Sequence, residues 1–260
     1  MLKTITIIFL TSLWFNGIAQ KKDTFQLVDL HIHLKGGFTI DEAISKSERE
    51  NIKYGVAVNG GIGFPIQNDY QLDSVLEVMK KYPQFYIGMQ AEGREWLSLF
   101  TNESLKKFDY IFTDAMTFVD SKGRRNRIWL KEETWIDDEK QFMDDLVQLI
   151  VKIITTEPIN IYVNPTYLPE QISGKYNELW TESRMDRVIQ AAKKCNVAIE
   201  INNRFKIPSA EFISRAKISG VKFTIGTNNT DGNFSGPDYA REMIIKCGLK
   251  ESDFYIPTRK

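Results

Sequence analysis

The sequence predicts an α/β fold of the TIM-like barrel type, and three observations predict it. Seven short β-rich runs alternate with longer amphipathic stretches from residue 25 onward. Several of the runs are almost continuously apolar, which is typical of strands covered by helices on both faces. Polar residues cluster at the carboxyl ends of nearly all the runs, and a closed barrel would bring those ends to one face, where barrel active sites lie. A doubly wound open sheet would spread them apart, so we favour the barrel.

The order of the elements follows from apolar pattern and capping residues. Thr39, with Glu42 three residues later, forms a capping box at the start of one helix, and Thr181 opens another. The longest irregular insert, residues 118–135, follows the fourth strand and is a candidate lid or substrate loop. The predicted strands are residues 25–33, 54–59, 85–92, 108–116, 159–165, 197–203 and 221–229, and the predicted helices are residues 39–50, 137–154, 181–195, 209–217 and 236–247.

Composition limits the class of partner. The chain has 260 residues with 42% apolar content, enough for one sizeable core. Lys and Arg together number 34, as do Asp and Glu, so no net field favours a polyanion. We therefore expect a small-molecule substrate and no nucleic-acid partner, and the sequence leaves the oligomeric state open.

Residues 1–20 have the pattern of a secretory signal peptide. Lys3 precedes an interrupted apolar stretch, and the small residues Gly17 and Ala19 precede the expected cleavage point. We predict a mature protein of residues 21–260 that forms a single barrel domain, is secreted or periplasmic, and has no membrane segment after cleavage. An uncleaved anchor or a first buried strand is the alternative interpretation of these residues.

Both histidines of the chain, His31 and His33, lie in the stretch VDLHIHLKGG. In a strand, residues i and i+2 point to the same side, so both imidazoles would enter the barrel mouth. Neutral imidazole suits zinc, iron and manganese, but a metal needs further ligands. The remaining donors are carboxylates at other strand ends, chiefly Glu92, Asp114 and Glu200. The alternative is a histidine pair satisfied by neighbouring polar groups.

The stretch VDLHIHLKGG resembles the opening motif of the PHP (polymerase and histidinol phosphatase) family and, more broadly, of amidohydrolase-like metal-dependent barrels. IGMQAEG resembles the segment with the family's third-strand glutamate ligand, placed on Glu92. IYVNP resembles a His-Pro segment with Asn164 at the histidine, and AIEINN resembles the Glu-Ile-Asn strand. FTIGTNNTDG resembles the final Gly-Ser-Asp-x-His motif, with Asn228 in place of the aspartate and Thr230 in place of the histidine. The resemblance spans residues 25 to about 235 and implies a distorted seven-stranded barrel.

The same resemblance implies a metal-dependent hydrolase with a reduced ligand set. The second motif's histidine is replaced by Asn59 or Gly60, so the family's trinuclear cluster cannot assemble whole. The remaining donors could hold one Zn²⁺, Mn²⁺ or Fe²⁺ ion and activate a bound water. The predicted metal ligands are His31, His33, Glu92 and Glu200, the predicted catalytic residues are Glu92 and Asp114, and the predicted substrate-binding residues are Asn164, Asn202, Asn228 and Arg204.

Three functional hypotheses follow. The first is an exported hydrolase whose metal-bound hydroxide attacks a phosphoester, amide or ester. The second is a non-catalytic barrel that binds a carbohydrate or another polar ligand. The third is a metal-independent glycoside hydrolase or lyase with Glu92 and Glu200 as its acid/base pair. Three arginines of the insert, Arg124, Arg125 and Arg127, would either clamp an anion or belong to a solvated loop.

Overall fold

The computed structural model describes residues 25–260, so the predicted signal peptide lies outside the described residues. The strands are β1 Leu27–Ile32, β2 Ile52–Gly60, β3 Tyr86–Ala91, β4 Tyr110–Thr113, β5 Thr117–Val119, β6 Arg125–Arg127, β7 Ile161–Tyr162, β8 Ala198–Asn202 and β9 Phe223–Gly226. The α-helices are α1 Ile40–Glu50, α2 Asp69–Met79, α3 Asn102–Leu105, α4 Glu139–Thr156, α5 Glu170–Ser173, α6 Tyr176–Leu179, α7 Glu182–Cys195, α8 Ala210–Ile218 and α9 Asp238–Lys246.

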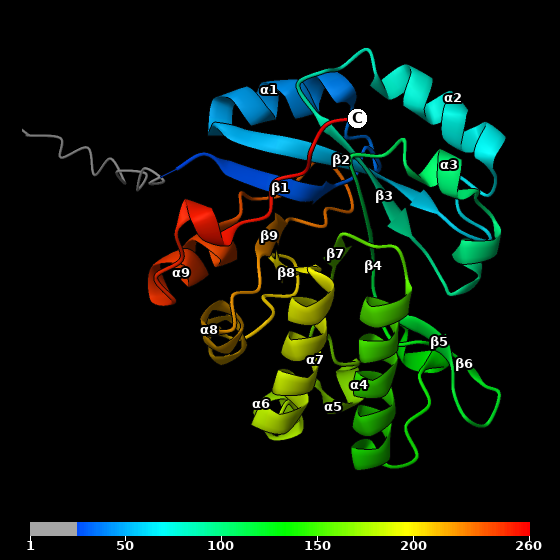
Figure 1. Ribbon diagram of the computed structural model, residues 1–260, viewed down its shortest axis with the longest axis vertical. Coiled ribbons are helices and arrows are strands. Elements are labelled where there is room, and N and C mark those ends of the chain that lie inside the picture. The colour runs from blue at the N-terminus through cyan, green and yellow to red at the C-terminus, as the bar shows by residue number, and fades with distance from the viewer. Residues whose placement is uncertain (1–24) are drawn as a thin grey trace, which may run out of the picture.

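Seven parallel strands close into a barrel in the order β1-β2-β3-β4-β7-β8-β9 (Figure 1). The predicted α/β TIM-like barrel is therefore confirmed. Each barrel strand falls within or around a predicted one, and the short strands β4 and β7 end before the polar residues predicted at their carboxyl ends. Those residues leave the hydrogen-bonded ladder and form loops at the mouth. Helices α2, α3, α5 and α6 are additional to the predicted ones.

Helix starts follow the predicted caps. The Thr39 side chain accepts a hydrogen bond from the Glu42 backbone N–H, and the Glu42 side chain accepts one from the Thr39 backbone N–H, so the capping box is formed. The Thr181 side chain caps α7 in the same way. In Figure 1, α1 and α2 lie along one flank of the barrel and α4 and α7 lie side by side along another.

The strands pack on both faces. Their outward side chains join a large cluster with the helices, whereas a smaller cluster fills the barrel interior. Tyr110 and Phe112 stack in this interior with ring centroids 6.0 Å apart. The Tyr110 hydroxyl donates to the Leu30 carbonyl at 2.7 Å, which satisfies the one polar atom that this ring buries. The interior is thus a packed floor beneath the mouth.

The insert after β4 folds as an antiparallel hairpin of β5 and β6. Asn126, which is fully buried, accepts a hydrogen bond from the Trp135 backbone N–H at 2.9 Å. The Ile128 N–H donates to the Met116 carbonyl at 3.0 Å. These bonds hold the insert together as a folded unit directly after β4.

The end of the chain closes the opposite end of the barrel. The Tyr255 N–H donates to the Phe223 carbonyl at the start of β9, and the Lys260 N–H donates to Asp109 at 2.7 Å. The ring of Phe254 packs on Phe25 with centroids 5.4 Å apart. Access to the barrel interior is therefore from the mouth.

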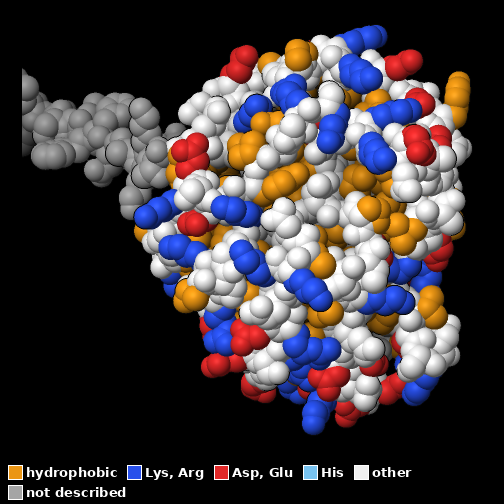
Figure 2. Space-filling view, in the orientation of Figure 1, with side chains coloured by type: hydrophobic (Ala, Val, Ile, Leu, Met, Phe, Trp, Pro, Cys, Tyr) orange, Lys and Arg blue, Asp and Glu red, His pale blue; other side chains and the backbone are white. Residues whose placement is uncertain are grey.

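Charged side chains of both signs are interspersed on the face shown in Figure 2, and no histidine is visible there. Both histidines are indeed buried. None of the helices formed by residues 25–260 has the length and hydropathy that crossing a bilayer requires.

The packing of the barrel interior predicts that a side chain at Gly88 destabilises the protein. A Cβ atom on Gly88 would lie 2.2 Å from the Tyr110 ring, so Gly88→Ala must displace that buried ring. We expect a loss of about 1–3 kcal/mol in the free energy of unfolding, measured by urea denaturation. Gly174→Ala is the matched control, because nothing lies within 4 Å of its added Cβ. Equal stabilities of the two variants would contradict the packing described for the barrel interior.

Candidate functional site

A bulge in β1 turns both histidines toward the barrel interior. The β1–β2 register shifts between Asp29 and Ile32. Leu30 and His31 therefore both face inward, because a bulge re-aims the side chains that follow it. The rings of His31 and His33 meet edge to face with centroids 5.0 Å apart. Their predicted placement on one side of the strand is confirmed.

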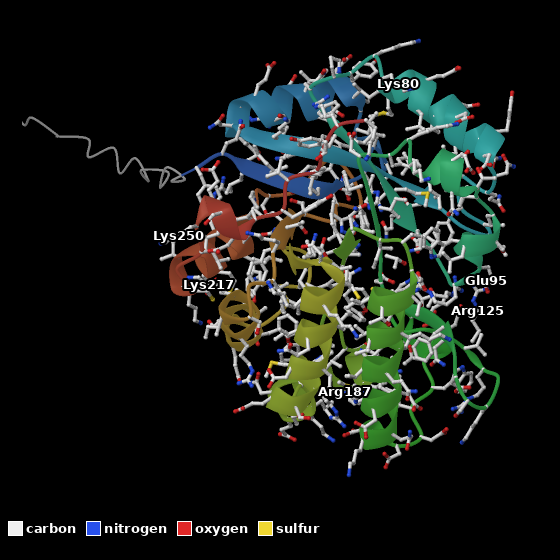
Figure 3. The ribbon with its side chains drawn as sticks, in the orientation of Figure 1. Lys80, Glu95, Arg125, Arg187, Lys217 and Lys250 are labelled. Atoms are coloured by element: carbon white, nitrogen blue, oxygen red, sulfur yellow. The ribbon has the colours of Figure 1, made fainter. Side chains whose placement is uncertain are left out.

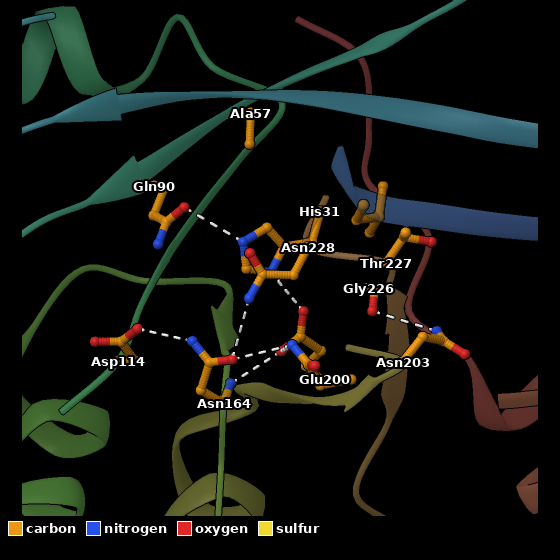
Figure 4. A network of polar contacts seen from close by, with 12 residues as sticks. His31, Ala57, Gln90, Asp114, Asn164, Glu200, Asn203, Gly226, Thr227 and Asn228 are labelled. Atoms are coloured by element: carbon orange, nitrogen blue, oxygen red, sulfur yellow. Dashed lines mark hydrogen bonds and ion pairs between the residues drawn. The ribbon is translucent and has the colours of Figure 1, made fainter. Parts of the chain in front are cut away.

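His31 is bound through both ring nitrogens. Nδ1 lies 2.6 Å from Glu200 Oε1, and both side chains are buried. Nε2 lies 3.3 Å from Gln90 Oε1 on β3. Both contacts are to oxygen atoms, so the ring spans the barrel from β8 to β3 (Figure 4).

His33 has one free ring nitrogen. Its Nδ1 donates to the Ala57 carbonyl at 3.0 Å, which leaves Nε2 as the unprotonated atom of the neutral ring. Nε2 is buried and has no hydrogen-bond partner in the described part of the chain. Burial, and next the charge of His31, hold the pKa of His33 well below its usual value. His33 is therefore a neutral imidazole with an unused lone pair.

Glu200 is the centre of the polar network below the mouth. Its second oxygen accepts hydrogen bonds from the Asn164 backbone N–H and the Asn202 side chain, each at 2.9 Å. Asn164 Oδ1 in turn accepts from Asn202 at 3.0 Å and from Asn228 at 3.5 Å (Figure 4). A Cβ on Gly226 would lie 1.8 Å from Glu200 Oε1, so only glycine leaves room for this carboxylate.

Two sets of side-chain hydrogen bonds join the carboxyl ends of β1 and β9. In the ladder these two strands share a single register pair, Asp29 with Ile225. Asn229 accepts from the His33 N–H at 2.7 Å and donates to the His33 carbonyl at 2.9 Å. Asp29 accepts from the Thr227 backbone and hydroxyl. Burial raises the pKa of Asp29 to about 6, and these donors oppose that rise.

A cavity of about 310 Å³ opens above this network at the mouth. Carboxyl, amide, cationic and aromatic side chains from most of the barrel strands and from the insert surround it. Cavities that combine polar groups with apolar walls are the default candidates for binding sites. Its lining residues include Lys35, Asn59, Phe64, Gln90, Glu92, Asp114, Trp129, Asn164, Arg204, Phe205 and Asn228.

Glu92 and Asp114 face the same cavity and repel one another. Burial, and next the charge of Asp114, raise the pKa of Glu92 to about 7. Burial also raises the pKa of Asp114, but the Met116 N–H and the Asn164 amide donate to it, each at 2.9 Å. Glu92 accepts the Asn59 amide at 2.7 Å and no other hydrogen bond from residues 25–260. Burial therefore makes both carboxyl groups hold a proton more tightly than usual, and the Asp114 carboxylate has more hydrogen-bond donors than the Glu92 carboxylate.

Two cations lie at the rim of the mouth. Burial, and next the charge of Arg204, lower the pKa of Lys35, which indicates that the two groups lie near one another. The Arg204 guanidinium lies 5.1 Å from the centre of the Phe205 ring. Neither residue forms an ion pair with another residue in the range 25–260. Arg94, by contrast, is bound below the surface to Glu157 at 2.8 Å.

The four predicted metal ligands do not form one ligand set. Among residues 25–260, no group of three or more His, Cys, Asp or Glu side chains is arranged to hold a metal ion. Glu200 is used by His31 and two amides, and the neutral amide of Gln90 faces His31 Nε2. Among residues 25–260, His33 Nε2 is the one buried ring nitrogen without a hydrogen-bond partner, and Glu92 faces the cavity with one amide partner. Catalytic zinc sites need three protein ligands, so these residues, as arranged, do not fit the expected ion.

The predicted substrate-binding residues divide into two groups. Asn164, Asn228 and Arg204 line the cavity, whereas Asn202 is fully buried beneath it, with its amide bound to Asn164 and Glu200. The Asn202 side chain supports the mouth from below, and its contact with a substrate stays a prediction. Glu200 is excluded from the cavity for the same reason, which removes it from the predicted Glu92–Glu200 acid/base pair.

The arginines of the insert belong to a solvated loop. Arg124 pairs with Asp120 and Asp137, both at 2.7 Å, and Arg127 pairs with Glu133. Arg125 is exposed and points away from the barrel (Figure 3). The anion clamp is therefore not formed by these residues.

Lys35, Phe64, Gln90 and Phe205 line the cavity but were not predicted from the sequence. Gln90 lies two residues before Glu92 and beside Asn59 in the β2–β3 register, so strand alternation would have placed it inside the barrel. Trp129 lines the cavity from the insert, the position expected of a substrate loop. Phe64 and Phe205 come from loops whose course no periodic pattern specifies.

Comparison with known proteins supports the fold. No family model and no curated protein matches the chain. Among solved structures, a histidinol phosphate phosphatase from Lactococcus lactis, complexed with zinc, L-histidinol and phosphate, matches with a TM-score of 0.59 at 14% identity, covering 86% of this chain and 95% of that one. An HpcH/HpaI aldolase from Desulfitobacterium hafniense gives a TM-score of 0.38 at 9% identity, covering 86% of this chain and 91% of that one. The phosphatase confirms the fold implied by the sequence resemblance, and the aldolase is too distant to carry an argument.

The polar network predicts a large stability effect at Glu200. Glu200→Gln keeps the shape of the side chain but turns an N–H₂ group toward donors, and it removes the charge opposite His31. Breaking one partner of a buried pair costs about 3–5 kcal/mol, and we expect a loss of this size in urea denaturation. Asp73→Asn, in the exposed Asp73–Lys107 pair, should cost less than about 1 kcal/mol. Similar losses at the two sites would mean that Glu200 does not hold the mouth together.

Proposed function

We propose that the chain is a hydrolase of small polar molecules that uses the carboxyl pair Glu92 and Asp114 for acid–base catalysis at the barrel mouth. The observation that supports this proposal most is that the two carboxyl groups line one cavity and that burial raises the pKa of both, with the charge of Asp114 adding to the rise at Glu92. Groups with perturbed pKa values in a cavity are candidates for catalysis.

The two carboxyl groups have different tasks. Asp114, whose anionic form is stabilised by two N–H donors, acts as the base that takes a proton from the attacking water. Glu92, whose pKa is raised to about 7, stays protonated and gives its proton to the leaving group. Asn59 donates to Glu92 and orients the carboxyl group toward the cavity. Water adds to the substrate, and the bond to the leaving group breaks.

The rest of the cavity binds the substrate. The amides of Asn164 and Asn228 offer donors and acceptors to hydroxyl or carbonyl groups, and the charges of Lys35 and Arg204 stabilise a developing anion. Trp129 offers an aromatic face. The similar phosphatase binds a small polar molecule, L-histidinol, together with phosphate, and this agrees with a small-molecule substrate.

A binding protein without catalysis is the second candidate. The amide-rich network that joins Asn164, Asn202 and Asn228 favours it, because preformed amides suit recognition of a polar ligand such as a carbohydrate. In that case Glu92→Gln would leave ligand affinity intact and there would be no turnover to lose. Export to the periplasm or the medium stays part of the proposal, and amino-terminal sequencing of the mature protein tests it.

Glu92→Gln should remove most of the activity. General acid catalysis contributes about 10²–10⁴-fold, so kcat should fall by that factor on whichever 4-nitrophenyl glycoside, ester or phosphate the wild type hydrolyses. The wild-type rate should decline as the pH rises through about 7, because Glu92 then loses its proton, and this limb should be absent in the variant. Carboxyl infrared difference spectra of the two proteins give the same titration without a substrate.

The control for this prediction is Glu103→Gln, a substitution at an exposed residue of α3. It should keep the wild-type rate and pH profile. Full activity of Glu92→Gln, or a Glu92 carboxyl that titrates near its ordinary pKa, would contradict the proposed acid.

Metal analysis tests the metal-dependent form of the hydrolase. The phosphatase neighbour is complexed with zinc, whereas the donors among residues 25–260 do not form a three-ligand set. We therefore expect untagged protein to contain metal well below equimolar amounts and to keep its activity in EDTA. Equimolar zinc, manganese or iron that is lost in His31→Ala and His33→Ala would support the metal-bound hydroxide instead.

A further inference from the structure

We propose that a second cavity, beside the barrel mouth, binds a small molecule with a flat apolar body and one acidic group. The cavity has a volume of about 530 Å³, larger than the mouth. It lies between the loops that follow β7 and β8 and the helices α6 and α9. None of the residues assigned to acid–base catalysis lines it, so its occupation does not depend on the proposed hydrolysis.

The walls of this second cavity are fixed before any ligand binds. The Tyr176 hydroxyl lies 2.6 Å from Thr166 Oγ1 and accepts the Ser209 N–H at 3.2 Å. The Tyr239 hydroxyl donates to the Pro208 carbonyl at 2.6 Å. Because both hydroxyl groups are satisfied by the protein, the tyrosines offer mainly their ring surfaces to a ligand. A preformed, largely apolar site of this kind suits a flat ring system.

The charged side chains at the rim of the second cavity favour a ligand with an anionic group. Lys206 and Lys246 line the cavity with one carboxylate, Glu242, so the rim carries an excess positive charge. All three are exposed, and within residues 25–260 neither lysine forms an ion pair. An acidic group on the ligand would therefore meet ammonium groups that need not first leave another partner.

The second cavity adjoins the mouth through one residue. Phe205 lines both cavities, and its ring meets Tyr167 edge to face with centroids 4.8 Å apart. Lys206, the next residue, has a left-handed backbone (φ 54°), which turns the loop between the two cavities. A ligand in the second cavity would thus lie against the far side of the aromatic wall of the mouth.

The test uses 8-anilino-1-naphthalenesulfonate, an aromatic monoanion whose fluorescence rises on binding, titrated into the full mature chain. Lys206→Glu combined with Lys246→Glu should weaken its affinity at least tenfold by reversing the rim charge. Asn177→Trp, at an exposed residue of α6 that lines the cavity, should weaken it similarly by filling the space. The neutral analogue N-phenyl-1-naphthylamine should lose affinity in Asn177→Trp but not in the lysine variant.

Matched controls separate this site from general surface binding. Lys80→Glu reverses an exposed charge at the end of α2. Figure 3 shows Lys80 on a different side of the molecule from Lys217 of α8. Asn102→Trp adds the same ring at the exposed start of α3. Both should keep the wild-type affinity within twofold. Unchanged affinity in the cavity variants, or equal losses in the controls, would overturn the proposal, whatever the protein hydrolyses.

Discussion

The buried carboxylate of Glu200 is the group on which the mouth of the barrel depends. It receives a ring nitrogen from β1, a backbone N–H from the loop after β7 and an amide from the end of its own strand. A carboxylate without solvent is costly unless such donors surround it. Each donor must lie within hydrogen-bond distance of the carboxylate, and residue 226 must have no side chain. This one charged group therefore fixes the positions of three strand ends relative to one another.

Above this charge the polar side chains are largely neutral. Amides link the strand ends to one another, and Gln90 lies against His31 where a further carboxylate would have offered a metal a charged ligand. These amides join the strand ends, but a neutral amide oxygen is a poor ligand for a transition-metal ion. The carboxyl groups of Glu92 and Asp114 line the cavity itself, where they can act on a bound molecule.

The sequence was sufficient for the barrel because apolar runs and capping residues are local signals, and the strand order follows from their succession. It also placed His31, Glu92, Asp114 and Glu200 at the mouth end correctly. It could not show which of them point into the cavity: the bulge in β1 and the orientation of Glu200 toward His31 depend on contacts between distant segments. Glu200 and Asn202, two residues apart on β8, were both predicted to be site residues, yet both side chains lie below the cavity.

The most direct test of the central claim is the nitrogen NMR spectrum of the imidazole rings in untagged protein, which contains only two histidines. The structure predicts a proton on Nδ1 of both rings, held by Glu200 in one and by the Ala57 carbonyl in the other, with no change when EDTA or equimolar zinc is added. A shift of both Nε2 resonances to metal-bound values with equimolar zinc would contradict it, because His31 would then be a ligand and not the partner of a buried carboxylate network.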